Sequence, residues 1–298
     1  MGLALARASS AAAEVFARAD RAAGFALTEL VERGPREALQ LTENTQPAVL
    51  TASLACLAAA REAGLPPPDF VAGHSLGEFS ALVAAHALAL EEAVRAVRAR
   101  GRFMQEAVPV GEGSMAAVLQ LAAPEVVAAC AEARAEAPGR VVVAANFNGP
   151  EQTVVAGHQD RVLRAGELCL AKGARRVVPL PVSAPFHSPL VAPAAPRLAE
   201  VLASLDFSDA AIPVVTNVTA TPETAAGTLR SLLVEQVTAP VRWTEIVARL
   251  WREGCDTFLE LGPGAALTGL VRRQLPQARA LPVSDPTRLA AALEALAT

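Results

Sequence analysis

The sequence lacks the features that mark several common classes of protein. Its four cysteines, Cys56, Cys130, Cys169 and Cys255, lie far apart and form no CxxC pair, which argues against a metal cluster and against a disulfide framework. No uninterrupted apolar run approaches the roughly 20 residues that span a bilayer. The net charge of −4 gives no sign of a nucleic-acid binder. We therefore expect a soluble, cytoplasmic protein with reduced thiols, no metal site, and no membrane or nucleic-acid partner.

What is present indicates a compact fold of the α/β class. The 298 residues are 52% hydrophobic and 19% charged, which is enough to build a sizeable core. Residues 1–60 have helical patterns, and from there to residue 111, and again after residue 182, short apolar strands alternate with helices. This alternation predicts a core of residues 1–111 and 183–298 with a mostly parallel sheet. Residues 112–182 instead follow the order βαββαβ, which predicts an inserted ferredoxin-like subdomain.

One stretch of the sequence has the pattern of a nucleophilic serine. In "FVAGHSLGEFSALVAA", Ser75 stands in GxSxG between an apolar strand and a helical pattern, which is the arrangement of a nucleophile elbow. The helix that follows would present free N–H groups, among them that of Leu76, to a developing oxyanion. The stretch alone also fits a glycine-flanked helix start capped by Ser75.

A serine nucleophile needs a base, and the chain has four histidines. His74 is adjacent to Ser75, so its side chain should point elsewhere, and His86 lies on the apolar stripe of the helix, where we expect a satisfied core histidine. His158 ends a predicted strand of the inserted segment and fits a surface residue. His187 lies in the proline-bounded loop "VSAPFHSPL", where a scaffold places functional groups. We favour His187 as the base, although spacing alone does not establish it.

Arg100 is the second candidate functional residue. It shares the apolar stripe of its helix with Val97 and Met104, whereas the other arginines of "EEAVRAVRARGRFMQ" lie on another face. An inward arginine is costly unless it meets a carboxylate or phosphate, and its planar fork suits a bidentate carboxylate. A structural ion pair and a snorkelling side chain are equally open alternatives.

These residues resemble those of the malonyl-CoA:acyl carrier protein transacylases and related acyltransferase domains of fatty acid and polyketide synthases. The matching segments run in family order from residue 42 to residue 273 and are "TENTQPAVLTAS", "GHSLGEFSALVAA", "VRARGRFMQEAVP", "NFNGPEQTVVAG", "PVSAPFHSPL", "LLVEQVTAPVRWTE" and "ELGPGAALTGLVRR". The resemblance implies an α/β-hydrolase-like core carrying a ferredoxin-like subdomain. It also implies transfer of a malonyl group from malonyl-CoA to the phosphopantetheine thiol of acyl carrier protein, without a metal or redox cofactor.

The resemblance assigns roles to six residues. Ser75 is implied to be the acylated nucleophile, His187 the base, and Arg100 the group that grips the malonyl carboxylate. The Leu76 N–H is implied to be an oxyanion donor, and the backbone carbonyl of Gln236 to orient the histidine. Asn148 in "NFNG" is implied to lie on a loop near the active site.

The acyl carrier proteins of this family are acidic, so docking is expected to be electrostatic. Arg175–Arg176 and Arg272–Arg273 are candidate contacts, with ordinary solvated charges as the alternative. The sequence does not determine the oligomeric state, and a monomer is one of the options. It also leaves open whether the protein serves fatty acid or polyketide synthesis, and it favours fatty acid synthesis.

The chain departs from the family at its start. Met1-Gly2 stands where the family has the end of an N-terminal strand and a "PGQGSQ" loop, so we expect that strand and the glutamine donor of the oxyanion hole to be missing. Loss of one such donor typically reduces the rate by about 10² to 10³. The alternatives are a serine esterase or thioesterase and, because of this missing segment, a non-catalytic protein that docks to the carrier.

Overall fold

The N-terminal part of the chain is helical. The computed structural model describes residues 1–109 and 111–297. Five helices precede the first strand: α1 (Leu3–Ala8), α2 (Ser10–Ala23), α3 (Leu27–Arg33), α4 (Arg36–Gln40) and α5 (Thr42–Glu62). Small and apolar side chains occur on several sides of α5, so that it is buried along most of its length, and it packs against α2 and α7 (Leu90–Glu106). The prediction of helices over residues 1–60 is confirmed.

Strands and helices then alternate, as the sequence predicts. Before the inserted segment come β1 (Val71–Ala72), α6 (Gly77–Ala84) and α7. After it come η1 (Pro189–Val191), α10 (Ala194–Ala203), β6 (Val214–Val215), β7 (Pro222–Glu223), α11 (Ala226–Glu235), α12 (Trp243–Arg252), β8 (Thr257–Leu261), α13 (Ala266–Gln274), β9 (Arg279–Val283) and α14 (Pro286–Ala297). β1 pairs in parallel with β6 and β8 with β9, while β7 runs antiparallel to β6. Within the described residues these strands form two separate sheets, β1–β6–β7 and β8–β9.

The segment between α7 and η1 builds a sheet of its own. Its elements are β2 (Gly113–Leu119), α8 (Ala123–Ala135), β3 (Val142–Gly149), β4 (Gln152–His158), α9 (Gln159–Ala171) and β5 (Arg176–Pro179). The strands are antiparallel in the order β3–β4–β2–β5. α8 and α9 cover one face, where a separate apolar cluster forms around Val118, Val126, Val155 and Val162. The predicted element order βαββαβ is confirmed.

The other face of this sheet turns toward the rest of the molecule. Met115 and Ala156 of this face belong to a cluster that includes Phe186 of the "APFH" loop. The end of β3 is joined to the segment before α12 by a hydrogen bond from the Phe147 N–H to the Val241 carbonyl, 2.8 Å long. These contacts bring the end of β3 and the histidine-bearing loop to the same region.

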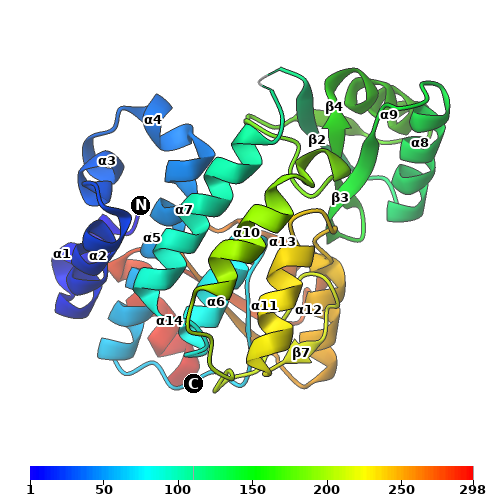
Figure 1. Cartoon of the computed structure of the whole chain (residues 1–298). Coiled ribbons are helices and arrows are strands. Elements are labelled where there is room, and N and C mark those ends of the chain that lie inside the picture. Colours follow the sequence, from blue (N-terminus) through cyan, green and yellow to red (C-terminus); the bar gives the residue numbers. More distant parts are fainter. Residues whose placement is uncertain (110, 298) are drawn as a thin grey trace.

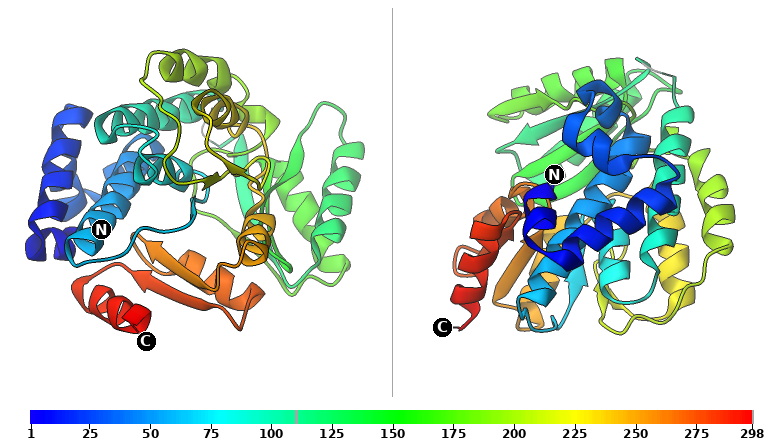
Figure 2. Two further views of the ribbon diagram at one scale, coloured as in Figure 1. Left: turned by 90° about the horizontal axis from the view of Figure 1, so that it is seen from below. Right: turned by 90° about the vertical axis from the view of Figure 1, so that its left-hand side faces the viewer.

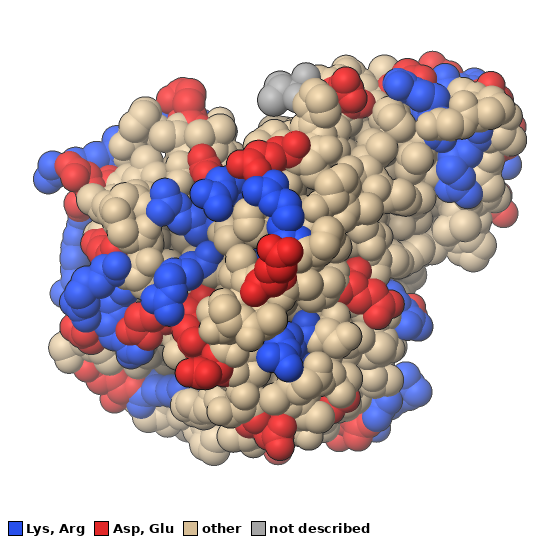
Figure 3. All heavy atoms as spheres, in the orientation of Figure 1, with Lys and Arg blue, Asp and Glu red and all other residues tan. Residues whose placement is uncertain are grey.

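The N-terminal helices and the inserted segment lie on opposite sides of the molecule, with α7 and α10 between them (Figures 1 and 2). Basic and acidic side chains are interspersed over the face shown in Figure 3, and both occur at the outer end of the inserted segment. No helix within the described residues has the length and hydropathy of a membrane span.

Candidate active site

Ser75 lies in a tight turn between β1 and α6. Its φ of 51° is in the left-handed region, which is a strained conformation for a serine and is common at functional positions. An added Cβ at Gly73 would lie 1.9 Å from the Gly77 carbonyl, so the turn can close only over a glycine. The Asn217 side chain braces the same turn, because its Oδ1 accepts from the Ser75 N–H and its Nδ2 donates to the Gly73 carbonyl, both at 2.6 Å.

The structure brings Ser75 and His187 together from positions 112 residues apart. The Ser75 Oγ lies 2.7 Å from the His187 Nε2. On the other side of the ring, Nδ1 faces the backbone carbonyls of Gln236 at 2.9 Å and Ala239 at 3.1 Å. A carbonyl only accepts, so Nδ1 carries the ring proton and Nε2 is left to accept the serine hydroxyl proton. The tautomer is therefore the one that a general base requires.

The surroundings of His187 keep it neutral. It is buried, and burial lowers the pKa of its imidazole to about 3, with a further contribution from the positive charge of Arg100. The imidazole is thus free to accept a proton throughout the neutral pH range. A proton that it does accept is readily passed on, because the imidazolium is poorly solvated there.

Arg100 projects from α7 into the same site. Its Nη2 donates to the Ser75 Oγ at 3.2 Å and to the Gln236 Oε1 at 3.0 Å, and its Nη1 donates to the Gln46 Oε1 at 2.8 Å. Its Nε is buried and has no partner among the described residues. The side chain is 3% exposed, and within the described part of the chain it forms no ion pair, so neither alternative interpretation describes it. Burial lowers the pKa of the guanidinium to about 10, which leaves it charged at neutral pH.

Glu78 and Asn217, two further polar residues of the site, were missed by sequence reasoning, as was Gln46. Glu78 of α6 is 1% exposed, and its Oε2 accepts from the Gln236 Nε2 at 2.8 Å and from the Asn217 N–H at 2.9 Å. Burial raises the pKa of the Glu78 carboxyl to about 7, against the lowering effect of these hydrogen bonds. One signal for Asn217 was available, since it closely follows β6, the parallel neighbour of β1, and the carboxyl ends of parallel strands meet at one edge.

Leu76 and Asn148 lie at the border of this group. The Leu76 N–H has no hydrogen-bond partner among the described residues, and it follows Ser75 directly. The Asn148 Oδ1 lies 2.7 Å from the His74 Nε2, and His74 also faces Trp243, with 5.6 Å between ring centroids. His74 therefore points away from Ser75, as expected, and Asn148 contacts this histidine rather than the serine.

The prediction for His86 is wrong. The helix ends at Ala84, and His86 adopts a left-handed φ of 61° and is exposed. The apolar stripe therefore stops before it. His158 is half-buried, accepts a hydrogen bond from the Val141 N–H at 2.8 Å, and lies at the end of β4 in the sheet of the inserted segment. In the described residues no three His, Cys, Asp or Glu side chains gather as metal ligands.

Comparison with known proteins gives a consistent result. A family model described as "Acyl transferase domain" matches residues 1–290. The chain is 46% identical over 281 residues to the malonyl CoA-acyl carrier protein transacylase of Escherichia coli K12, covering 94% of this chain and 90% of that protein. It is 45% identical over 286 residues to the enzyme of the same name from Bacillus subtilis, covering 96% of this chain and 89% of that protein.

Solved structures agree with these sequence matches. The malonyl CoA-acyl carrier protein transacylase of Coxiella burnetii superposes with a TM-score of 0.97 at 40% identity, over 100% of this chain and 93% of that one. A malonyl-transacylase solved in complex with its type II PKS acyl-carrier protein gives a TM-score of 0.95 at 43% identity, over 99% of this chain and 94% of that one.

Proposed function

Because the chain belongs to the acyl transferase domain family, we propose that Ser75 carries a malonyl group from malonyl-CoA to the phosphopantetheine thiol of an acyl carrier protein. One observation carries the assignment of Ser75. Its Oγ is contacted at once by a neutral base, the His187 Nε2 at 2.7 Å, and by a buried cation without a carboxylate partner, the Arg100 Nη2 at 3.2 Å. A base activates the hydroxyl, and the cation suits an acyl group that ends in a carboxylate.

Transfer proceeds in two balanced half-reactions. The Ser75 Oγ attacks the thioester carbonyl carbon while its proton passes to the His187 Nε2. The carbon–sulfur bond then breaks, the CoA thiolate leaves as the thiol with that proton, and a malonyl-serine ester remains. In the second half-reaction His187 takes the proton of the carrier thiol, the sulfur attacks the ester, and the proton returns to the Ser75 Oγ. The carbonyls of Gln236 and Ala239 hold the ring throughout.

The Leu76 N–H is our candidate for the oxyanion donor. It has no partner among the described residues and adjoins Ser75 at the start of α6. A free N–H at a helix N-terminus is suited to stabilise negative charge as it develops on the carbonyl oxygen.

Arg100 accounts for the choice of acyl group. In the free protein its donors meet neutral amide oxygens of Gln46 and Gln236, which bind a guanidinium less strongly than a carboxylate does. A malonyl group bound at Ser75 adds a carboxylate acceptor beside the Arg100 Nη2, whereas an acetyl group adds none. The site therefore discriminates against acetyl donors.

We assign the fold more finely as an α/β-hydrolase-like core of residues 1–111 and 183–298, with a ferredoxin-like subdomain of residues 112–182. The strand order β3–β4–β2–β5 with α8 and α9 on one face supports the subdomain. The parallel pairs and the serine turn after β1 support the core.

Three arginines mark the candidate docking surface for the carrier. Arg175, Arg176 and Arg273 line a cavity of about 560 Å³ together with Glu151, and no ion pair holds the three arginines among the described residues. Arg272 differs from them, because its Nε and Nη2 both donate to the Ala280 carbonyl, at 3.1 and 2.7 Å, whereas Arg175 and Arg273 each donate once to a glutamine side chain. Arg273→Glu should raise the KM for the carrier and leave acylation of Ser75 by malonyl-CoA unchanged. An unaltered KM would remove this surface from the docking site.

The function is tested by following the label of radiolabelled malonyl-CoA, with and without phosphopantetheinylated carrier. Transfer predicts a labelled protein whose label moves to the carrier, and Ser75→Ala is expected to take up none. Free malonate as the main product would indicate a hydrolase instead, and no reaction would indicate a non-catalytic docking protein. This chemistry requires no metal or redox cofactor, so treatment with EDTA should leave the rate unchanged.

A further inference from the structure

Glu78 is a buried carboxylate that the reaction described above does not use. It lies three residues after Ser75 and is 1% exposed, and no ion pair involves it within the described residues. A carboxylate in such a position is costly unless it is hydrogen-bonded. Both donors to its Oε2 belong to residues that touch the reacting groups, namely the Gln236 Nε2 and the Asn217 N–H.

The Gln236 side chain connects Glu78 to Arg100. Its Nε2 donates to the Glu78 Oε2 at 2.8 Å and to the Ser75 carbonyl at 3.1 Å, and its Oε1 accepts from the Arg100 Nη2 at 3.0 Å. The two ends of an amide have nearly the same shape, so that its hydrogen-bond partners decide which end points where. The Glu78 oxygen, which accepts the shorter of the two bonds, draws the NH2 end toward itself together with the Ser75 carbonyl, and the oxygen end is thereby turned toward the guanidinium. With the amide reversed, Arg100 would face donors in place of an acceptor.

We propose that Glu78 is a positioning residue for substrate selection: through the Gln236 amide it fixes Arg100 beside the Ser75 Oγ and so sets the preference for malonyl over acetyl donors. The inference rests on the proposed function of the same site. Gln46 holds the other terminal nitrogen of Arg100 from α5 but has no hydrogen bond with Glu78. Only the Gln236 side of the guanidinium therefore depends on Glu78.

Glu78 also contacts Asn217, and this second contact provides a control for the test. Its other donor, the Asn217 N–H, belongs to the residue whose side chain braces the serine turn at Ser75 and Gly73. If loss of Glu78 acts through Asn217, it displaces the nucleophile, and kcat should fall equally for every donor. If it acts through Gln236, the KM for malonyl-CoA should rise, and the malonyl-to-acetyl ratio of kcat/KM should change.

The test compares four variants in acylation of Ser75 by radiolabelled malonyl-CoA and acetyl-CoA. Two variants change Glu78: Glu78→Met keeps the length of the side chain and removes its acceptor, and Glu78→Gln keeps one acceptor oxygen. Gln236→Met removes the connecting amide. Asn217→Ala removes the side chain that braces the serine turn. We expect Glu78→Met and Gln236→Met to reduce the malonyl-to-acetyl ratio of kcat/KM by about 10- to 100-fold, because a displacement of about 1 Å can cost up to about 100-fold. Glu78→Gln should restore most of the ratio, and Asn217→Ala should slow both donors while keeping their ratio within about threefold of the unsubstituted protein.

Equal losses for both donors in Glu78→Met, matching those of Asn217→Ala, would overturn the proposal, because Glu78 would then act on the serine turn alone. If Glu78→Met shows no cooperative thermal transition, Gln236→Met decides, and an unchanged ratio there overturns the proposal. The proposed function fails separately, if the unsubstituted protein takes up no malonyl label at all.

Discussion

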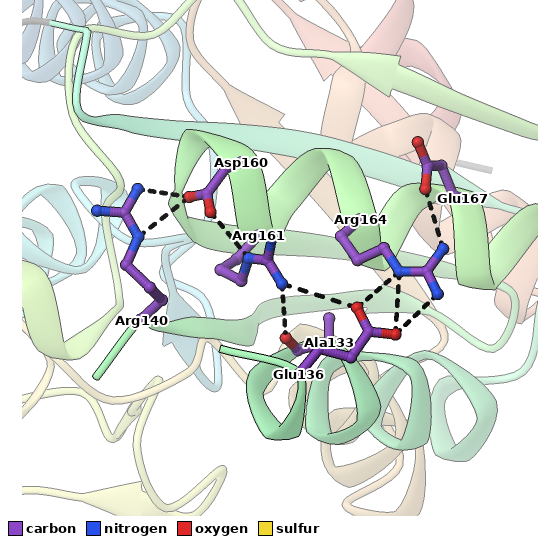
Figure 4. Close-up of polar contacts among 7 residues, drawn as sticks. All are labelled: Ala133, Glu136, Arg140, Asp160, Arg161, Arg164 and Glu167. Atoms are coloured by element: carbon purple, nitrogen blue, oxygen red, sulfur yellow. Dashed lines mark hydrogen bonds and ion pairs between the residues drawn. The ribbon is translucent and has the colours of Figure 1, made fainter. Parts of the chain in front are cut away.

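Two regions of this molecule hold networks of arginine and carboxylate side chains, and the charges in the two networks have opposite surroundings. On the inserted segment, Arg164 of α9 pairs with Glu136 at 2.7 Å and with Glu167 at 3.0 Å, and Arg140 pairs with Asp160 (Figure 4). Every one of these side chains is partly exposed. Around Ser75, in contrast, Arg100 and Glu78 are both buried, and the neutral amide of Gln236 lies between them.

The pKa shifts of the two networks run in opposite directions. Hydrogen bonding to Arg140 lowers the pKa of the Asp160 carboxyl to about 2, and pairing with Glu136 raises the pKa of Arg164, so each group is held in its charged form. Burial does the reverse at the site, where it raises the pKa of Glu78 and lowers that of Arg100. The arginines of the exposed network have carboxylate partners already, whereas Arg100 has only amide and hydroxyl oxygens. Of these two networks, the buried one is therefore the one that leaves an arginine free to bind a carboxylate from outside.

The largest effect that tests this comparison is expected from Arg100→Ala. Loss of a charge-assisted pair with the acyl carboxylate should lower kcat/KM for malonyl-CoA by about 10² to 10³ and change kcat/KM for acetyl-CoA far less. The measurement is acylation of Ser75 by each labelled donor. Arg95→Ala is the matched control, since Arg95 lies on the same helix and is exposed. If Arg100→Ala keeps its preference for malonyl-CoA, Arg100 does not bind the malonyl carboxylate, and its lack of a carboxylate partner has no role in selection.

A smaller effect is expected in the pH dependence of stability. The folded protein raises the pKa of Glu78 from 4.5 to about 7, so between these values the folded state binds a proton that the unfolded state does not. The stability contributed by this group is present below pH 4.5 and is lost as the pH rises through 7. Glu78→Gln has no such titration. The Tm of the unsubstituted protein should therefore fall relative to that of Glu78→Gln between pH 5 and pH 8.

The effect of His187 on the pH dependence of stability is opposite to that of Glu78, but it does not affect this test. Its pKa is lowered from 6.5 to about 3 on folding, so its contribution to stability is present above pH 6.5 and is lost as the pH falls toward 3. Both proteins contain this histidine, and the difference between their Tm values cancels its effect. Parallel Tm curves over pH 5–8 would contradict the assignment of a raised pKa to Glu78.

Much of the fold and part of the candidate site could be predicted, because those signals are local. The order βαββαβ follows from patterns within single elements, and Ser75, His187 and Arg100 stand in short motifs whose residue types suit their positions. Glu78 could not be predicted in the same way, and for Asn217 the one available signal was its place just after β6. Their partners are 139 to 158 residues away in the sequence, and a glutamate in an amphipathic helix gives no sign of burial until the partner strand and loop are placed against it.

The smallest effect is expected on the exposed network. Arg164→Ala removes the contacts with Glu136 and Glu167, but exposed ion pairs are screened by water and salt and hold long side chains in one geometry at an entropic cost. The Tm should therefore fall by no more than about 2 °C, and less in 0.5 M salt than in 0.05 M salt. The rate of malonyl transfer should not change, since α9 lies on the face of the sheet that is turned away from Ser75. A fall of more than about 5 °C would mean that the exposed network determines the stability of the inserted segment. The contrast drawn between the exposed and the buried charges would then not hold for stability.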